Sequence, residues 1–131
     1  MQSILNAQQN HWENMFDKNK EMFGSEPSFP AHYAKKLLEE KNISKLLELG
    51  AGQGRDTLFF AQNQFDITAL DYTQQGLNAI AYKAKTLNLP LLLCQHDVRQ
   101  ALPFEDASFE ACFSHMLYCM PLSTAELEFL N

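Results

Sequence analysis

The sequence has little of what marks several classes of protein. No apolar run approaches the roughly 20 residues that a membrane-spanning helix needs. Residues 1–6 carry neither a basic stretch nor an apolar one, so we expect no signal peptide. The cysteines are odd in number and widely spaced, at Cys94, Cys112 and Cys119. That pattern favours reduced thiols in a cytoplasmic protein over a disulfide framework.

Positive charge is also scarce. Lysine and arginine number 10 against 16 aspartates and glutamates, which gives a net charge of -6. The one basic pair, Lys35-Lys36, lies in a helical pattern, where a solvent-exposed face is expected. An acidic chain without a basic cluster argues against nucleic acid as a partner. The length of 131 residues suits one domain, and 46% hydrophobic residues suffice for a packed core.

The first part of the chain predicts helices rather than strands. Residues 1–30 are expected to form a helical segment that caps the main domain, residues 31–131. Apolar side chains at spacing i, i+3, i+4 mark one face of its helix: Trp12, Met15 and Phe16. A segment with two prolines ends that helix. A second helix is predicted over 31–41, with three apolar residues turned inward: Ala34, Leu37 and Leu38.

Beyond residue 44, short apolar segments alternate with helical patterns. Strands are predicted at 45–49, 65–70, 91–94 and 109–114. Helices are predicted over 55–63 and 74–88, the second with Thr73 as its N-cap, and a capping box at 123–126 opens another. This alternation indicates βαβ units with right-handed crossovers, and hence an α/β fold with a mainly parallel sheet. Ligands of such sheets bind beyond the carboxyl ends of the strands.

Polar and glycine-rich features follow each predicted strand. A turn containing Gly50, Gly52 and Gly54 comes after the first strand, Asp71 after the second and Asp97 after the third. Glycines without Cβ let a ligand approach the backbone N–H groups at a helix N-terminus. An acid after the second strand can accept hydrogen bonds from a ribose diol, and a second acid can accept from an exocyclic amine. The strand ends therefore predict a nucleoside-binding site.

This combination resembles the class I S-adenosylmethionine-dependent methyltransferases of the type 11 group. Residues 48–54 are similar to their first motif, Asp71 matches their ribose-binding acid, and residues 96–98 match the segment that contacts adenine. Residues 102–111 are similar to the loop and fourth strand of that family. Phe23, Gly24 and Pro27 are similar to a tellurite-resistance-like subgroup, in which the N-terminal helix folds over the cofactor.

The resemblance implies a Rossmann-like, three-layer α/β/α fold, S-adenosylmethionine as cofactor and a small-molecule methyl acceptor. It also implies a set of cofactor-binding residues: Glu48, Gly50, Ala51, Gly52, Gly54, Arg55, Asp71, Tyr72, Asp97, Val98 and Ser114. No catalytic base can be identified. His115 is best interpreted as a structural histidine at the sheet edge. A metal site at Cys112, His115 and Cys119 is not expected, because no fourth ligand stands nearby.

Several residues admit a simpler interpretation. Asp71 could cap the following helix, Asp97 could be a solvated loop acid, and Tyr72 could cover the sheet edge instead of stacking on adenine. Arg55 could be merely exposed. A nicotinamide-binding oxidoreductase is an alternative function, but its G-x-G-x-x-G motif needs glycine where Arg55 stands. A P-loop is excluded because the G-K-[ST] sequence is missing.

The family sheet has seven strands, and the last three are expected to be missing here. A cofactor-binding fragment without turnover is therefore a second alternative. The fourth strand would form an exposed apolar edge, which invites pairing with another chain. We expect a homodimer formed through that edge or through residues 116–130.

Overall fold

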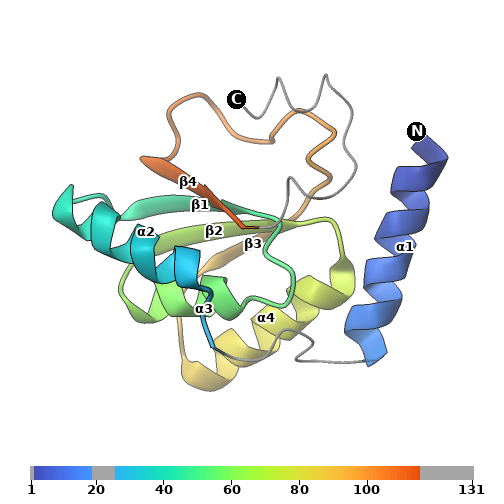
Figure 1. Ribbon diagram of the computed structural model, residues 1–131, viewed down its shortest axis with the longest axis horizontal. Helices are drawn as coiled ribbons and strands as arrows, with labels where there is room; N and C mark the ends of the chain where they lie inside the picture. The colour runs from blue at the N-terminus through green and yellow to red at the C-terminus, as the bar shows by residue number, and fades with distance from the viewer. Residues whose placement is uncertain (1, 19–25, 116–131) are drawn as a thin grey trace.

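The computed structural model describes residues 2–18 and 26–115, which form eight elements (Figure 1). Four are helices: α1 Gln2–Lys18, α2 Phe29–Glu40, α3 Arg55–Gln62 and α4 Gln74–Leu87. Four are strands: β1 Lys45–Leu49, β2 Asp66–Asp71, β3 Leu92–Gln95 and β4 Ala111–Ser114. All four predicted strands are confirmed, with ends shifted by at most two residues. The helix predicted from Ser123, along with Phe23, Gly24 and Cys119, lies outside the described residues.

The four strands form one parallel sheet in the order β3-β2-β1-β4. Helix α3 connects β1 to β2 and helix α4 connects β2 to β3, so the chain moves away from β1 in one direction. The segment 96–110 then returns the chain to the other side of β1. Figure 1 shows α2, α3 and α4 on one face of the sheet and this segment, in orange, on the opposite face. The Rossmann-like α/β class predicted from the sequence is confirmed.

Strand β1 lies in the middle of this arrangement and is buried on both faces. Its alternate side chains enter different apolar clusters, as the two-residue period of a strand requires. Leu46 packs on the helical side with Phe60, Ile67 and Phe113. Leu47 and Leu49 pack on the other side, in the cluster that includes Leu70 and Val98. The carboxyl end of β1 is thus fixed from both faces.

Helix α2 belongs to the core on the helical side, although one of its predicted contacts is wrong. Ala31 and Leu38 are buried, whereas Leu37 is 39% exposed. A helix rotates about 100° per residue, so a face centred on Ala31 and Leu38 turns Leu37 outward. The helix also begins earlier than predicted, after Ser28, whose hydroxyl accepts a hydrogen bond from the Ala31 N–H at 3.3 Å. Among the residues described, no helix is long and apolar enough to cross a membrane.

Candidate functional site

The glycine turn after β1 is held in a conformation that few other residues adopt. Gly50, Gly52 and Gly54 have φ angles of 72°, 59° and 88°, all in the left-handed region. The Ala51 N–H donates to the Leu70 carbonyl at 2.9 Å, which ties the turn to the end of β2. Gly54 is the N-cap of α3 and supplies no side-chain cap. The turn therefore presents backbone at the start of a helix, as the sequence predicts.

A further glycine, Gly76, lets α4 pack directly on this turn. A Cβ at Gly76 would lie 2.4 Å from the Gly52 carbonyl oxygen. On the other side, a Cβ at Gly54 would lie 2.5 Å from Cγ1 of Ile80 in α4. The sequence reasoning missed Gly76. A glycine inside a helix is about 1 kcal/mol less stable than an alanine. Its presence in a predicted helix is therefore a signal that another part of the backbone packs closely there.

The Glu48 side chain extends from β1 toward α3 and is buried next to the glycine turn. Its Oε1 accepts a hydrogen bond from the Thr57 hydroxyl of α3. The pKa of Glu48 is raised to about 8, chiefly by burial; the Thr57 hydrogen bond opposes the rise, and the nearby carboxylates of Asp56 and Asp71 add to it. At pH 7 Glu48 is therefore mostly protonated. A cation placed beside it would favour the charged form.

Asp71 is the last residue of β2 and joins the glycine turn to the start of α4. Its Oδ1 accepts from the Gly52 N–H at 3.0 Å, and its Oδ2 accepts from the Thr73 N–H at 3.0 Å and from the Thr73 hydroxyl. Burial raises the pKa of Asp71, while these hydrogen bonds oppose the rise. A carboxylate offers about four acceptor positions, so room remains for a hydroxyl donor from a ligand.

Thr73 occupies the predicted N-cap position of α4, but its side chain makes no cap hydrogen bond. Its hydroxyl is turned toward Asp71 instead. The cap comes from α1: Glu13 accepts from the Gln74 N–H at 3.0 Å and from the Gln75 N–H at 2.8 Å. A carboxylate is favourable at a helix N-terminus because the helix dipole is positive there.

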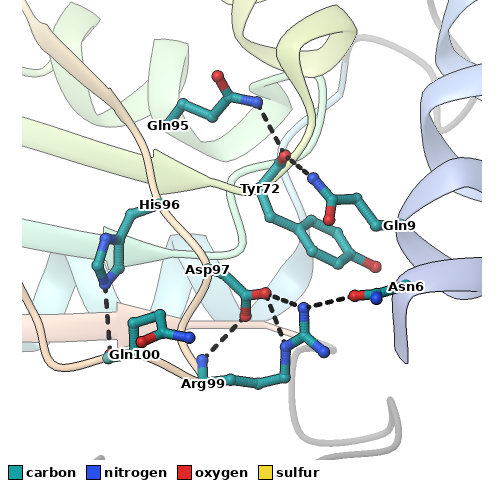
Figure 2. A network of polar contacts seen from close by, with 8 residues as sticks. All are labelled: Asn6, Gln9, Tyr72, Gln95, His96, Asp97, Arg99 and Gln100. Atoms are coloured by element: carbon teal, nitrogen blue, oxygen red, sulfur yellow. Dashed lines mark hydrogen bonds and ion pairs between the residues drawn. The ribbon is translucent and has the colours of Figure 1, made fainter. Parts of the chain in front are cut away.

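Helix α1 lies over the same end of the sheet and touches the glycine turn. Phe16 is buried, and a Cβ at Gly52 would lie 3.6 Å from its ring. About two turns earlier, the Gln9 side-chain amide donates to the Tyr72 carbonyl at 2.8 Å. The Gln95 amide donates to the same carbonyl at 3.2 Å (Figure 2). The backbone of Tyr72 is thus bound from both α1 and β3.

The predicted adenine-binding segment lies beside Tyr72. Figure 2 shows the Tyr72 ring between α1 and the pair formed by Asp97 and Arg99. Burial raises the pKa of the Tyr72 phenol to about 12. The His96 N–H donates to the Asp71 carbonyl at 3.0 Å and so brings the ends of β2 and β3 together. Val98 is buried against the sheet, in the cluster of Leu47, Leu49 and Leu70.

Asp97 is held by Arg99, a residue that the sequence reasoning did not single out. Its Oδ1 accepts from the Arg99 N–H at 3.0 Å, and its Oδ2 accepts from Nε at 2.7 Å and from Nη2. Burial alone would raise the pKa of Asp97, but the hydrogen bonds and charge of Arg99, with His96, hold it below its usual value. Asp97 is therefore an ionised, oriented acceptor and not simply a solvated loop acid.

The two remaining predicted residues differ in their surroundings. Ser114 ends β4 opposite Leu49, and its Oγ is buried with no hydrogen-bond partner among residues 2–18 and 26–115. Arg55 opens α3 but lines a hollow with Tyr82 and Lys83, which includes no other predicted site residue. The same described ranges hold no cluster of His, Cys, Asp and Glu able to bind a metal ion.

Most of the predicted residues are therefore brought to one edge of the sheet. The sequence reasoning missed six further residues that hold this edge together: Gln9, Glu13, Thr57, Gly76, Gln95 and Arg99. Thr57 and Gly76 follow predicted site residues closely in the chain and could have been found from that spacing. Gln9 and Glu13 lie more than 60 positions from their partners, and no local pattern reveals such pairs.

Comparison with known proteins gives a consistent picture. A family model described as "Methyltransferase domain" matches residues 46–130, well over half of the chain. A Methanococcus maripaludis structure has a TM-score of 0.69 at 20% identity, covering 93% of this chain and 57% of the other. A Clostridium acetobutylicum structure named an S-adenosylmethionine-dependent methyltransferase has a TM-score of 0.58 at 18% identity, covering 80% and 42%.

One curated protein is similar over a shorter region. "Hemagglutinin 1" of Eikenella corrodens is 32% identical over 65 residues, which are 50% of this chain and 22% of that protein. The chain thus spans about a fifth of this curated relative and about half of the two solved structures.

Proposed function

Because the chain belongs to the methyltransferase domain family, we propose that it takes part in methyl transfer from S-adenosylmethionine to a small-molecule acceptor. Family membership implies this cofactor. The observation that carries the proposal is the meeting of the glycine turn, Asp71 and Asp97 at one sheet edge. The edge is where ligands bind open parallel sheets, beside the central strand at which the strand order reverses.

The residues at this edge fit the chemical groups of S-adenosylmethionine. Glu48 is buried and would meet a cationic amine, and the glycine turn offers close access to backbone. Asp71 would accept from ribose hydroxyls, and Asp97 from the adenine amine. Ser114 Oγ, buried with no hydrogen-bond partner among the described residues, adds a hydroxyl able to donate or accept.

When bound, the cofactor supplies an electrophilic methyl group on a sulfonium. Direct displacement by a nucleophile needs no metal and no covalent intermediate on the protein, so this chain's residues contribute by binding and orientation. Orientation can supply a large share of a barrier, about 7–11 kcal/mol in well-arranged reactions. Burial of Glu48 and Asp71 and the cover given by Phe16 keep water from this end of the turn.

Calorimetric titration with S-adenosylhomocysteine and with NAD tests this assignment. We expect binding of S-adenosylhomocysteine and none of NAD. Binding of NAD without response to S-adenosylhomocysteine would favour the nicotinamide-linked alternative. Binding without turnover across a panel of small acceptors would favour a cofactor-binding fragment.

Proton release offers a second, sharper signature. An amine bound beside Glu48 favours its ionised form, and the pKa of about 8 means that this carboxyl starts mostly protonated at pH 7. We expect the apparent binding enthalpy to depend on the buffer's ionisation enthalpy, with protons released. The Glu48→Gln variant should lose that dependence. A cytoplasmic location and homodimer formation through the β4 edge or through residues 116–130 stay predictions, and residues 116–130 lie outside the described residues.

A further inference from the structure

Arg99 connects two parts of the candidate site that lie far apart in the sequence. One end of its guanidinium holds the Oδ2 of Asp97 through Nε, at 2.7 Å, and through Nη2. Nη2 also donates to the Asn6 side-chain oxygen of α1 at 3.2 Å, across 93 positions of the chain (Figure 2). The same cationic group therefore touches the predicted adenine acceptor and the helix that covers it.

Burial makes this contact more consequential than a surface ion pair. The side chain of Arg99 is only 8% exposed and that of Asp97 is 21% exposed. Exposed pairs contribute little, but removing one partner of a buried pair leaves an uncompensated charge. The planar guanidinium also fixes the direction of the carboxylate, which a lysine ammonium would not do.

Helix α1 makes two other polar contacts with this edge, at points that Arg99 does not reach. Glu13 caps α4, and Gln9 binds the Tyr72 carbonyl. Asn6 lies about one turn before Gln9, so the Arg99 contact anchors the N-terminal part of the helix.

We propose that Arg99 is a positioning residue that couples the seating of α1 to recognition of the adenine amine by Asp97. This inference rests on the proposed function for the identity of the ligand. It assigns to Arg99 two effects: it aims the Asp97 carboxylate at the ligand, and it draws α1 over the bound nucleoside. Removal of the Asn6 contact should loosen α1, and removal of the Asp97 contact should leave the Asp97 carboxylate without a fixed direction.

Two substitutions separate the ends. Asn6→Ala removes the hydrogen bond between Arg99 and α1, whereas Arg99→Gln removes that bond and the hold on Asp97. We expect S-adenosylhomocysteine to bind about threefold more weakly to Asn6→Ala and at least about tenfold more weakly to Arg99→Gln. The double variant should bind no more weakly than Arg99→Gln alone, since Asn6 acts through Arg99. Asn10→Ala on α1 and Lys36→Gln on α2 are matched controls with no expected effect.

A change of nucleobase tests the role of Asp97 directly. S-inosylhomocysteine lacks the exocyclic amine, so wild-type protein should prefer S-adenosylhomocysteine. Arg99→Gln should lose most of that preference, and Arg99→Lys should recover part of it. A merely structural role for Arg99 would weaken both ligands equally and leave the preference unchanged. Tighter binding by Arg99→Gln would show that Arg99 competes with the ligand, which also overturns the proposal.

The position of α1 can be read without any ligand. Trp12 is the single tryptophan of the chain and lies on α1. Acrylamide should quench its fluorescence more strongly in Asn6→Ala and Arg99→Gln than in wild type, and not in Asn10→Ala. If wild type binds neither nucleoside, the proposed function fails. In that case unchanged quenching in both variants refutes the Arg99 contact as well, and increased quenching upholds its role in seating α1.

Discussion

The two helices that precede the sheet are attached to it by different forces. Helix α2 buries Ala31 and Leu38 in the main apolar cluster, and Asp56 of α3 binds the Ser28 N–H and hydroxyl at its start, both at 2.7 Å. Among the α1 side chains described, only Phe16 is buried, and the contacts reported above are mainly polar. We therefore expect α2 to be part of the folding unit and α1 to be a separately docked cover on the candidate site.

The largest effect is expected where α2 enters the core. Leu38→Ala should lower the free energy of unfolding by about 2–5 kcal/mol, because it removes buried methyl groups and leaves a cavity. Urea unfolding followed by circular dichroism measures this change. Leu37→Ala, one position earlier and exposed, is the matched control and should change stability far less. Equal losses for the two variants would contradict the described orientation of α2.

Glu48 gives the core a pH dependence. Its pKa is about 8 in the folded protein and 4.5 ordinarily, so the folded state binds the proton more tightly. The stabilisation from this proton is complete below pH 4.5 and is lost as the pH rises toward 8.

Glu48→Gln should remove this fall in stability, because the amide imitates the neutral carboxyl. Urea unfolding at pH 5, 6, 7 and 8 tests it, with wild type declining more steeply than the variant. Parallel pH profiles for the two proteins would show that Glu48 ionises normally in the folded chain.

Phe16→Ala tests the other side of the comparison. If α1 is a separately docked cover, the variant should release the helix. It should lower the free energy of cooperative unfolding of the domain by less than about 1 kcal/mol. Hydrogen exchange should show loss of protection confined to α1. A loss as large as that of Leu38→Ala, spread over the sheet, would place α1 within the core unit and end the distinction.

The smallest effect is expected at the trans cap of α4. Glu13→Gln keeps the shape but removes the charge at the helix N-terminus, which is worth about 0.3–1 kcal/mol at low salt. The change should appear as stronger acrylamide quenching of Trp12, and it should fade as salt is added. Asn14→Lys, at an exposed position of the same helix, changes the net charge by the same +1 and is the matched control.

The parts of this fold that the sequence predicts are those encoded by neighbouring residues. The apolar run that becomes β1, the glycine turn and the alternation of strands and helices all depend on local patterns, and the strands form where expected. Thr73 shows the limit of such reasoning, because Glu13 of α1 accepts from the Gln74 N–H and Gln75 N–H in its place, while the Thr73 hydroxyl donates to Asp71. Leu37 shows another, since helix period alone leaves the centre of the buried face ambiguous.

The sequence predicts a helical cap, but the contacts that seat it could not be predicted, because they join residues far apart in the chain. Glu13 meets Gln74 and Gln75, and Asn6 meets Arg99, at separations of 61, 62 and 93 positions. Each is a polar pair whose members look like ordinary surface residues in their own segments. Only the folded arrangement of α1 over the strand ends gives them a role.

The central claim, that the ends of β1 and β2 form a nucleoside site, is tested most directly at Asp71. S-adenosylhomocysteine should be titrated into wild type, Asp71→Ala and Asp66→Ala, the last being an exposed acid at the opposite end of the same strand. We predict that Asp71→Ala weakens binding by about 1–3 kcal/mol, the scale of a lost charged hydrogen bond. Asp66→Ala should leave it unchanged. Equal affinity in all three folded proteins would contradict the claim.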